Sequence, residues 1–344
     1  MDKALDILKQ YYGYSSFREG QEEIIKEILN ENDVLTIMPT GGGKSICYQV
    51  PAILLDGITI VISPLISLMK DQVDNINNLG IKSAYINSSL SNIEINNILD
   101  EASKNEIKIL YVAPERLESQ AFLELIASIN VSMVAIDEAH CVSQWGHDFR
   151  SSYRRISRVI SLLKNRPIVT AFTATATDEV REDIINLLEL NNPKVFISGF
   201  DRKNLKIIIE KGVNKKNYIL DYINNNRVES GIIYASTRKE VDNLHELLNS
   251  KGLQVEKYHA GLSDDHRKAA QENFIYDKCN IIIATNAFGM GIDKPNVRYV
   301  IHYNMPKNIE GYYQEIGRAG RDGEESECIM LFSPGDVQTQ KYII

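Results

Sequence analysis

The segment from Met38 to Ser45 reads Met-Pro-Thr-Gly-Gly-Gly-Lys-Ser and combines residue types that bind phosphate groups. Glycines let backbone amides close around phosphate oxygens, a lysine at this position reaches the β- and γ-phosphates, and a neighbouring hydroxyl can ligate magnesium. Met38 departs from the general phosphate-loop pattern, which begins with glycine, so the glycines could alternatively form a plain surface turn. We expect phosphates to contact Thr40, Gly41, Gly42, Gly43, Lys44 and Ser45, with Ser45 also on the metal.

A second candidate is the run Asp137-Glu138-Ala139-His140, which directly follows an apolar segment ending at Ile136. Ligands of open α/β sheets bind at the carboxyl ends of strands, which is where these carboxylates would lie. We expect Asp137 to hold magnesium, usually through water, and Glu138 to orient and polarise the water that attacks the γ-phosphorus. Acidic pairs after strands also cap helices, and that alternative stays open.

Both candidates depend on strands that position them, and short β-branched runs supply such strands. Five runs alternate with helical patterns in the first part of the chain: 34–37, 58–62, 107–112, 131–136 and 168–172. After a less periodic stretch near residues 198–204, three more follow: 231–234, 281–284 and 297–302. This alternation predicts parallel sheets covered by helices. We therefore expect an α/β protein with two tandem lobes, residues 1–199 and 200–344, each a mostly parallel sheet with helices on both faces.

Three helix positions follow from the spacing of residues. Apolar side chains between Gln21 and Leu29 recur at helical spacing, and a helix should begin at Lys44, after the glycines. Thr177, followed by two acidic residues, has the form of a capped helix start. These apolar stripes predict packing rather than chemistry.

The composition is that of an ordinary globular chain, with 344 residues of which 44% are hydrophobic and 24% charged. No apolar run suggests a membrane span and the start shows no apolar signal region. We therefore expect a cytoplasmic protein, associated with the nucleoid in a prokaryote, with no membrane partner. The four cysteines lie far apart, which predicts small buried thiols and no zinc. The formal charge of −8 neither supports nor excludes a nucleic-acid partner.

A phosphate loop followed by Asp-Glu-Ala-His resembles the pattern of superfamily 2 helicases of the DEAH type, and further segments resemble the RecQ family. These segments are residues 17–23, 63–72, 113–117, 143–150, 171–176, 258–262, 287–295 and 313–323, and they span nearly the whole chain. The resemblance implies a catalytic core of two RecA-like lobes with ATP and Mg²⁺ as cofactors. It also implies 3′ to 5′ movement on single-stranded or partly duplex DNA, which is unwound in recombination, repair and replication.

The resemblance implies an adenine site near the N-terminus. Gln21 would hydrogen-bond the base edge, with Arg18 and Tyr14 flanking the ring, because an amide can both donate and accept and flat side chains can stack on a base. From the residues alone, Tyr14 and Phe17 could equally be core aromatic residues.

Gln314, Arg318 and Arg321 should lie on one helix and approach a common face. The resemblance implies that Arg321 acts as an arginine finger on the γ-phosphate, with Arg318 beside it and Gln314 near the attacking water. A solvated helix face is the alternative for these residues.

The segment from Ser143 to Tyr153 carries the only tryptophan of the chain. The resemblance implies an aromatic-rich loop that couples DNA to hydrolysis, with aromatic side chains stacking on bases and Arg150 holding a phosphate. A buried core tryptophan is the alternative. The residues expected to take part are Ser143, Gln144, Trp145, His147, Phe149 and Arg150.

Hydroxyl and cationic side chains in both lobes are expected to follow the DNA backbone, with Thr173 and Thr175 linking the lobes and the two ligands. Each is a weak candidate by itself, because exposed residues of these types are common. The expected contacts are Arg116, Thr173, Thr175, Ser236, Arg238 and Thr285, with Ser63, Lys70, Gln72 and Thr237 as further members.

Two other functions remain compatible with the residues: an RNA helicase of a neighbouring family, and a nucleic-acid-binding ATP switch without efficient catalysis. His140, in place of the second Asp of the related Asp-Glu-Ala-Asp group, and the Trp145 loop favour DNA over RNA. RecQ proteins commonly continue into a zinc-binding module and a winged-helix domain. If the wedge that separates the two DNA strands belongs to those domains, we expect strand separation by these 344 residues to be weak or absent.

Overall fold

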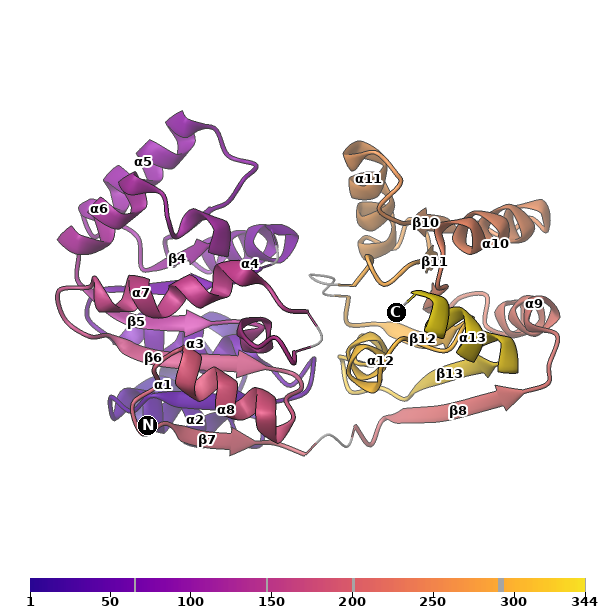
Figure 1. The fold of residues 1–344 in the computed structure, drawn as a ribbon, viewed down its shortest axis with the longest axis horizontal. Coiled ribbons are helices and arrows are strands. Elements are labelled where there is room, and N and C mark those ends of the chain that lie inside the picture. The colour runs from indigo at the N-terminus through magenta and orange to yellow at the C-terminus, as the bar shows by residue number, and fades with distance from the viewer. Residues whose placement is uncertain (65, 147, 200–201, 290–293, 344) are drawn as a thin grey trace. The chain divides into compact units, whose positions relative to one another are not determined.

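The computed structural model describes residues 1–64, 66–146, 148–199, 202–289 and 294–343 (Figure 1). The chain divides into two compact units, Met1–Phe200 and Asp201–Ile344. Each unit has its own parallel sheet and its own apolar cores on the two faces of that sheet.

The first unit contains a seven-stranded parallel sheet in the order β3-β4-β2-β5-β6-β1-β7, counted over the described residues. Its interior strands are rich in isoleucine and valine and almost fully buried, because helices cover both faces. The strands are β1 (Val34–Ile37), β2 (Ile58–Ile62), β3 (Ser83–Ile86), β4 (Ile109–Val112), β5 (Val131–Ile136), β6 (Ile168–Thr173) and β7 (Lys194–Ile197).

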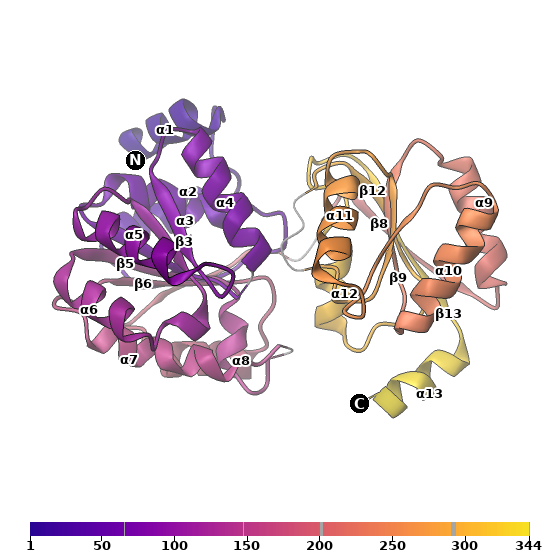
Figure 2. The same cartoon turned by 90° about the horizontal axis from the view of Figure 1, so that it is seen from above.

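Two groups of helices cover this sheet. Helices α2 to α4 bury side chains such as Ile24 and Tyr48 against one face, and α5 to α8 bury side chains such as Phe122 and Ile184 against the other. Figure 2 shows the two groups on opposite sides of the strands. The helices are α1 (Asp2–Ile7), α2 (Gln21–Leu29), α3 (Lys44–Leu54), α4 (Ile66–Asn78), α5 (Asn92–Ser103), α6 (Gln120–Ser128), α7 (Ile156–Ser161) and α8 (Asp178–Leu187). Shorter helical turns are η1 (Leu8–Tyr12), η2 (Pro114–Arg116), η3 (Ala139–Val142) and η4 (Ser151–Arg155).

The second unit contains a six-stranded parallel sheet in the order β10-β11-β9-β12-β13-β8, again over the described residues. Helices α9 and α10 pack Ile219 and Leu244 against one face, and α11 and α12 pack Phe274 and Ile316 against the other. The strands are β8 (Leu205–Lys211), β9 (Ser230–Tyr234), β10 (Glu256–Tyr258), β11 (Ile281–Ala284), β12 (Val297–His302) and β13 (Ser326–Phe332). The helices are α9 (Lys215–Asn225), α10 (Arg238–Ser250), α11 (Asp264–Ile275), α12 (Ile309–Ile316) and α13 (Pro334–Ile343).

The expected α/β architecture, with parallel sheets and helices on both faces, is confirmed. Every run expected to be a strand forms one, although β4 begins at Ile109 rather than at residue 107. The sequence patterns did not indicate β3, β7, β8, β10 and β13, and the first four of these are the edge strands of the two sheets. An edge strand is open to solvent along one side, so polar side chains weaken the apolar pattern that reveals interior strands.

The expected helix starts are also confirmed. Helix α2 spans Gln21–Leu29, and α3 begins at Lys44. The Thr177 side chain accepts from Val180 N at 3.3 Å and so caps α8.

Candidate active site

The loops after β1, β2, β5 and β6 all leave the first sheet at the carboxyl ends of its strands, which form one edge of the sheet. Ile37 lies beside Thr173 at the carboxyl ends of β1 and β6. Backbone hydrogen bonds continue this register beyond the strands, because Met38 N donates to Thr173 O at 3.0 Å and Asp137 N donates to Ile62 O at 2.9 Å. The topology therefore brings the phosphate loop and the acidic pair to the same edge.

The segment between β1 and α3 is a tight loop built on its glycines. Gly41 and Gly43 have φ angles of 81° and 84°, in the left-handed region that favours glycine. A Cβ atom at Gly42 would lie 2.6 Å from Met38 Cγ, so the loop leaves no room for a larger residue there. Gly43 directly precedes α3, whose N-terminal amides and dipole favour a phosphate. The segment therefore has the strand, loop and helix order of a phosphate site rather than that of a plain surface turn.

Lys44 is the first residue of α3, and its ammonium group lies over the loop. The Nζ atom donates to the carbonyls of Met38 and Pro39 at 3.0 and 3.4 Å. Thr40 and Ser45 are only partly buried in the same stretch. An ammonium group, two accessible hydroxyls and a helix N-terminus thus offer an anion several donors within one short segment.

Gln21 and Arg18 contact the phosphate loop from the start of α2. The buried Gln21 amide accepts from Arg18 N at 2.9 Å and donates to Gly43 O at 3.1 Å. The Arg18 guanidinium donates to Gly41 O at 2.8 Å. The two side chains expected at an adenine base therefore also hold the loop backbone, and a base that pairs with Gln21 would share or replace these hydrogen bonds.

Tyr14 is 52% exposed, which excludes the alternative that it is a core aromatic residue. Phe17, in contrast, is half-buried and packs against the small core of Ala4, Leu8 and Ile25. Of these two aromatic residues, only Tyr14 presents a ring on which a base could stack.

Asp137 is buried at the end of β5. Burial and the neighbouring Glu138 carboxylate raise the pKa of Asp137 well above its ordinary range. The Lys44 charge and the hydrogen bond that Glu138 N donates to Asp137 Oδ1 act in the opposite direction. A divalent cation at this carboxylate would offset the cost of burying its charge. Asp137, together with the Ser45 hydroxyl, therefore fits a magnesium ion that completes its coordination with phosphate and water oxygens.

Glu138 adopts a left-handed backbone conformation with a φ angle of 48°. This conformation costs a residue with a side chain about 1 kcal/mol or more and recurs at functional sites. Glu138 precedes η3 but makes no side-chain capping hydrogen bond to it, so helix capping does not account for this carboxylate. Its Oε2 atom lies 3.4 Å from His140 Nδ1.

His140 connects the acidic segment to β6. The Thr173 hydroxyl donates to Thr175 O at 3.1 Å, and His140 Nδ1 lies 2.8 Å from the same hydroxyl oxygen. Because the hydroxyl proton is already used, His140 Nδ1 carries the proton of this second hydrogen bond. His140 had been given no role of its own in the sequence analysis, although it completes the Asp-Glu-Ala-His run.

The aromatic-rich loop starts and ends on buried anchors. Ser143 is buried, donates to Asp183 Oδ2 at 2.6 Å and accepts from Trp145 N at 3.1 Å. At the far end, the buried Tyr153 hydroxyl donates to Asp137 O at 2.8 Å. The expected coupling loop is therefore attached directly to the residue proposed as a metal ligand, and Ser143 serves as an anchor of the loop.

Trp145 is 75% exposed, which excludes the alternative of a core tryptophan. Gln144, next to it, is also exposed. His147, expected in the same loop, lies outside the described residues. The loop therefore presents its largest aromatic ring to solvent, where a base could stack on it.

The last part of this loop is held by charged contacts. Phe149 is 37% exposed, and the Arg154 guanidinium lies 5.2 Å from its ring centroid. Arg150 pairs with Asp148 at 3.0 Å and donates to Pro64 O at 3.2 Å. These contacts fix the Arg150 side chain, so a phosphate at Arg150 would join an existing ion pair.

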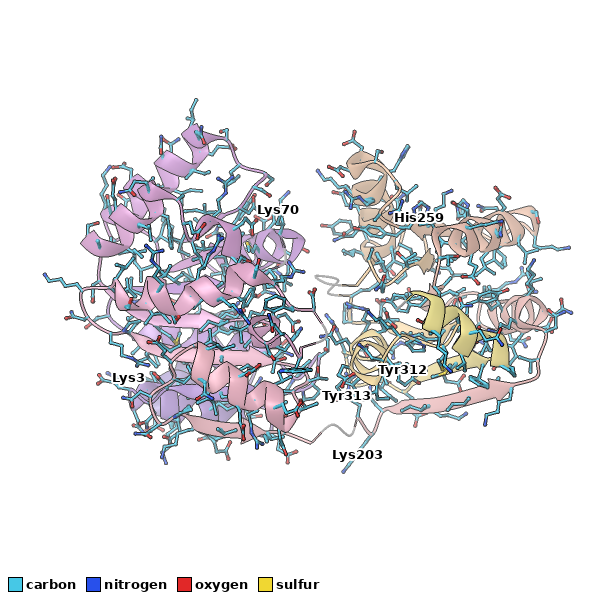
Figure 3. The ribbon with its side chains drawn as sticks, viewed as in Figure 1. Lys3, Lys70, Lys203, His259, Tyr312 and Tyr313 are labelled. Carbon is cyan, nitrogen blue, oxygen red and sulfur yellow. The ribbon has the colours of Figure 1, made fainter. Side chains whose placement is uncertain are left out.

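The residues of the first unit expected to follow a nucleic-acid backbone differ in accessibility. Lys70 is exposed on α4 (Figure 3), and Arg116 is half-buried with its Nε donating to Asn87 O at 3.2 Å. Thr173 and Thr175 are buried, and their positions suit internal connections better than direct contacts.

The expectation that Gln314, Arg318 and Arg321 share one helix is wrong. Helix α12 contains Gln314 but ends at Ile316, and both arginines lie in the turn that follows. Gly320, in this turn, has a φ angle of 55°, a left-handed conformation that interrupts a helix.

Arg318 is 6% exposed, so the alternative of a solvated face is wrong for it. Its guanidinium lies so close to Gly289 that a Cβ atom there would be 2.7 Å from Nη2. Burial raises the pKa of Tyr234 to about 12, against the opposing effect of the nearby Arg318 charge. On α12, Glu315 Oε2 lies 2.8 Å from His302 Nε2. The turn and its helix are thus held to the second sheet through buried polar contacts.

The expected nucleic-acid contacts of the second unit gather at one edge of its sheet. Ser236 and Arg238 follow β9, and Thr285 follows the adjacent β11. Arg238 is exposed, Ser236 is partly buried and Thr285 is buried. His259 lies just after β10, the next strand in this sheet (Figure 3).

Three buried polar residues at this edge had not been singled out from the sequence: Asn304, Asp336 and Gln340. Their partners lie on elements far away in the chain, so no local pattern marks them. Asn304 follows β12, whereas Asp336 and Gln340 lie on α13.

The expected buried thiols are confirmed, since all four cysteines are buried. Within the part of the chain that the structure describes, no group of three or more His, Cys, Asp or Glu side chains could hold a metal ion. Among the same residues, no helix has the length and apolar character needed to cross a membrane.

Two family descriptions match the chain. Residues 18–184 match the DEAD/DEAH box helicase family, and residues 214–323 match the helicase conserved C-terminal domain. The first match contains the phosphate loop and the acidic pair, and the second contains Ser236, Gln314, Arg318 and Arg321.

Known relatives are similar over the whole chain. The chain is 50% identical to the ATP-dependent DNA helicase RecQ of Bacillus subtilis over 100% of its own length and 58% of that protein. It is 41% identical to the probable ATP-dependent DNA helicase RecS of the same organism, over 100% of this chain and 70% of the relative. The chain thus spans less than two thirds of the RecQ relative and somewhat more of RecS.

Solved structures agree with the fold. The S. cerevisiae protein Dbp5, bound to RNA and ADP BeF3, superposes with a TM-score of 0.75 at 20% identity, covering 98% of this chain and 90% of that chain. At this level of identity the likeness concerns architecture alone, and it confirms the expected pair of RecA-like lobes.

Proposed function

Because the chain belongs to the RecQ family of superfamily 2 helicases, we propose that it hydrolyses ATP in order to move along single-stranded DNA in the 3′ to 5′ direction. The name of the Bacillus subtilis relative, an ATP-dependent DNA helicase, supports this activity and this substrate. Residues 1–199 would form the ATP-binding lobe and residues 200–344 the second helicase lobe. We further propose that the protein works on partly duplex DNA in recombination, repair and replication, inside the cytoplasm.

The nucleotide would be held by the phosphate loop and by the start of α2. Lys44 and the N-terminal amides of α3 would bind the phosphates, while Gln21 recognises the adenine edge between Tyr14 and Arg18. Ser45 and Asp137 would hold Mg²⁺, which supplies charge neutralisation on the phosphate oxygens. The buried Asp137 carboxyl with its raised pKa supports this role, because a nearby cation would favour its charged form.

Hydrolysis would be carried out by Glu138 with support from the second unit. The Glu138 carboxylate orients and polarises the attacking water, and its left-handed backbone conformation is consistent with such a fixed role. Arg321 would place its charge on the γ-phosphate, with Arg318 beside it and Gln314 near the water. The burial of Arg318 supports a role in holding this turn.

One observation supports the proposal that DNA is coupled to hydrolysis: both ends of the aromatic-rich loop are attached to buried residues. Trp145 is exposed in this loop, while the Tyr153 hydroxyl at its end donates to Asp137 O at 2.8 Å. A base that stacks on Trp145 would shift or fix the loop, and the shift would reach the magnesium ligand through one hydrogen bond. Phe149, Arg150, Gln144 and His147 would complete the loop's contact with the strand.

Steady-state ATP hydrolysis tests this proposal. The chain is assayed with Mg²⁺ alone, with single-stranded DNA and with RNA of the same sequence, in parallel with Trp145→Ala. We expect strong stimulation by DNA, weaker stimulation by RNA, and loss of the DNA effect in the variant. Equal stimulation by RNA would favour an RNA helicase, and the absence of turnover under every condition would favour a non-catalytic switch. Displacement of streptavidin from the 5′ or the 3′ end of an oligonucleotide would report the direction of movement.

A further inference from the structure

A buried polar network surrounds Ser236 at the carboxyl edge of the second sheet. Asn304 is 9% exposed, and its Oδ1 accepts from Ser236 N at 3.0 Å. Its Nδ2 donates to Glu240 Oε1 at 3.1 Å and to Asp336 Oδ1 at 3.3 Å. Asp336 in turn pairs with Lys215 Nζ at 2.9 Å. The backbone of Ser236 is therefore tied through Asn304 to α10, α13 and α9.

Gln340 contacts the Ser236 side chain from α13. Its Nε2 atom donates to Met305 O at 2.6 Å and to Ser236 Oγ at 3.3 Å. A backbone carbonyl can only accept, so the contact with Met305 identifies this amide atom as the nitrogen. Gln340 thus presents a donor to Ser236 and occupies a lone pair of its hydroxyl. The position is fixed because Asp336, one helical turn earlier, anchors α13 to Lys215.

This arrangement leaves the Ser236 hydroxyl proton for an external acceptor. Among the residues that the structure describes, no hydrogen bond takes this proton. The neighbouring Thr237 differs, since its hydroxyl donates to Glu240 Oε2 at 2.9 Å and accepts from Glu240 N at 3.2 Å. Of the two adjacent hydroxyls, that of Ser236 can still donate a hydrogen bond, whereas that of Thr237 already donates to Glu240 and caps α10.

We propose that Gln340 and Asn304 are positioning residues that hold Ser236 as a hydrogen-bond donor to a phosphate oxygen of single-stranded DNA. This inference rests on the proposed function, which supplies the DNA strand. A phosphodiester carries no proton at neutral pH and can only accept, so it is matched by a hydroxyl whose acceptor side is already occupied. Helix α13 thereby contributes to DNA binding through Ser236.

Reversing the polarity of Gln340 tests the proposal. In Gln340→Glu the side chain becomes an acceptor and takes the Ser236 proton, so the donor to DNA is lost. Gln338→Glu is the matched control, because it introduces the same charge at an exposed position of the same helix. The probe is a fluorescent single-stranded oligonucleotide, and its binding is followed by anisotropy at fixed salt. We expect Ser236→Ala and Gln340→Glu each to raise Kd about tenfold, as for a hydrogen bond to a charged group, and Gln338→Glu to leave Kd almost unchanged.

The double variant separates positioning from a general structural effect. If Gln340 acts through Ser236, Ser236→Ala combined with Gln340→Glu binds no more weakly than either single variant. Additive losses, or equal binding by Gln340→Glu and Gln338→Glu, would overturn the inference while leaving the proposed function intact. A parent chain that neither binds single-stranded DNA nor is stimulated by it would remove the proposed function, and this inference with it.

Discussion

His140 Nδ1 lies 2.8 Å from the Thr173 hydroxyl oxygen, which joins the segment after β5 to the end of β6 inside the first unit. The same imidazole nitrogen lies 3.4 Å from the Glu138 carboxylate. A movement at Thr173 would therefore change the position of the proposed water-orienting group through a single side chain. We therefore expect the Asp-Glu-Ala-His run to transmit displacement between the ends of these two strands as well.

Thr173→Val removes this hydrogen bond while preserving the shape of the side chain. We expect the ratio of DNA-stimulated to unstimulated ATP hydrolysis to fall about tenfold, because His140 loses its acceptor on β6 and the link from Thr173 through His140 to Glu138 is broken. Thr173→Ser retains the hydroxyl and serves as the control. The measurement is steady-state hydrolysis with and without single-stranded DNA, and an unchanged ratio in the valine variant would disprove the connection.

Glu138→Gln should abolish hydrolysis while sparing nucleotide binding. The amide cannot orient and polarise water as a carboxylate does, so we expect a loss of about 10² to 10⁴ in kcat. The Kd for a fluorescent ATP analogue should remain within severalfold of that of the parent, since the proposed partner of the Glu138 carboxylate is the attacking water and not a bound phosphate. A parallel loss of nucleotide affinity would show that Glu138 is instead needed for binding.

Trp145→Ala should leave stability almost unchanged but abolish stimulation by DNA. The side chain is 75% exposed, so we expect the free energy of unfolding to change by at most about 0.5 kcal/mol. Truncation of a core tryptophan would instead cost about 3 to 5 kcal/mol. Urea unfolding monitored by circular dichroism checks the first expectation, and ATP hydrolysis with increasing single-stranded DNA checks the second. A large loss of stability would make the loop a packing element.

Asp336→Asn should destabilise the second unit in a pH-dependent manner. Burial alone would raise the pKa of Asp336, but hydrogen bonds from Lys215, Ser333 N and Asn304 outweigh it and hold this pKa below its ordinary value. A lowered pKa in the folded state means that the carboxylate stabilises the fold above the unfolded-state pKa, near about 4, and that this contribution is lost as pH falls through the folded-state value. Breaking this buried pair should cost about 3 kcal/mol at neutral pH.

Urea unfolding of the parent and of Asp336→Asn at several pH values measures this effect. The difference in the free energy of unfolding should be largest at neutral pH and should shrink as pH falls below about 4. A difference that stays constant over the whole range would mean that Asp336 acts through packing and not through its charge.

The sequence alone determined the features that depend on neighbours along the chain. The glycines before Lys44 predicted a helix start, and the β-branched run before Asp137 predicted a strand with carboxylates at its end; both are present. Most interior strands, though not β13, could be recognised because both of their faces are buried and their residues are almost uniformly apolar. The four edge strands were not predicted, because one side of each is open to solvent and polar side chains weaken the apolar pattern.

Only the tertiary structure decided which distant residues meet. The strand order places Thr173 next to the phosphate loop and lets Tyr153 reach Asp137, and it surrounds Ser236 with Asn304 and Gln340. Helix α12 ends before Arg318, and that arginine is buried, whereas the spacing of residues alone had predicted a continuous helix. Spacing along a sequence reports local conformation, whereas strand order and side-chain burial arise from packing between segments that lie far apart in the chain. Local sequence therefore determined the candidate catalytic and binding motifs, and the tertiary structure determined the contacts between them.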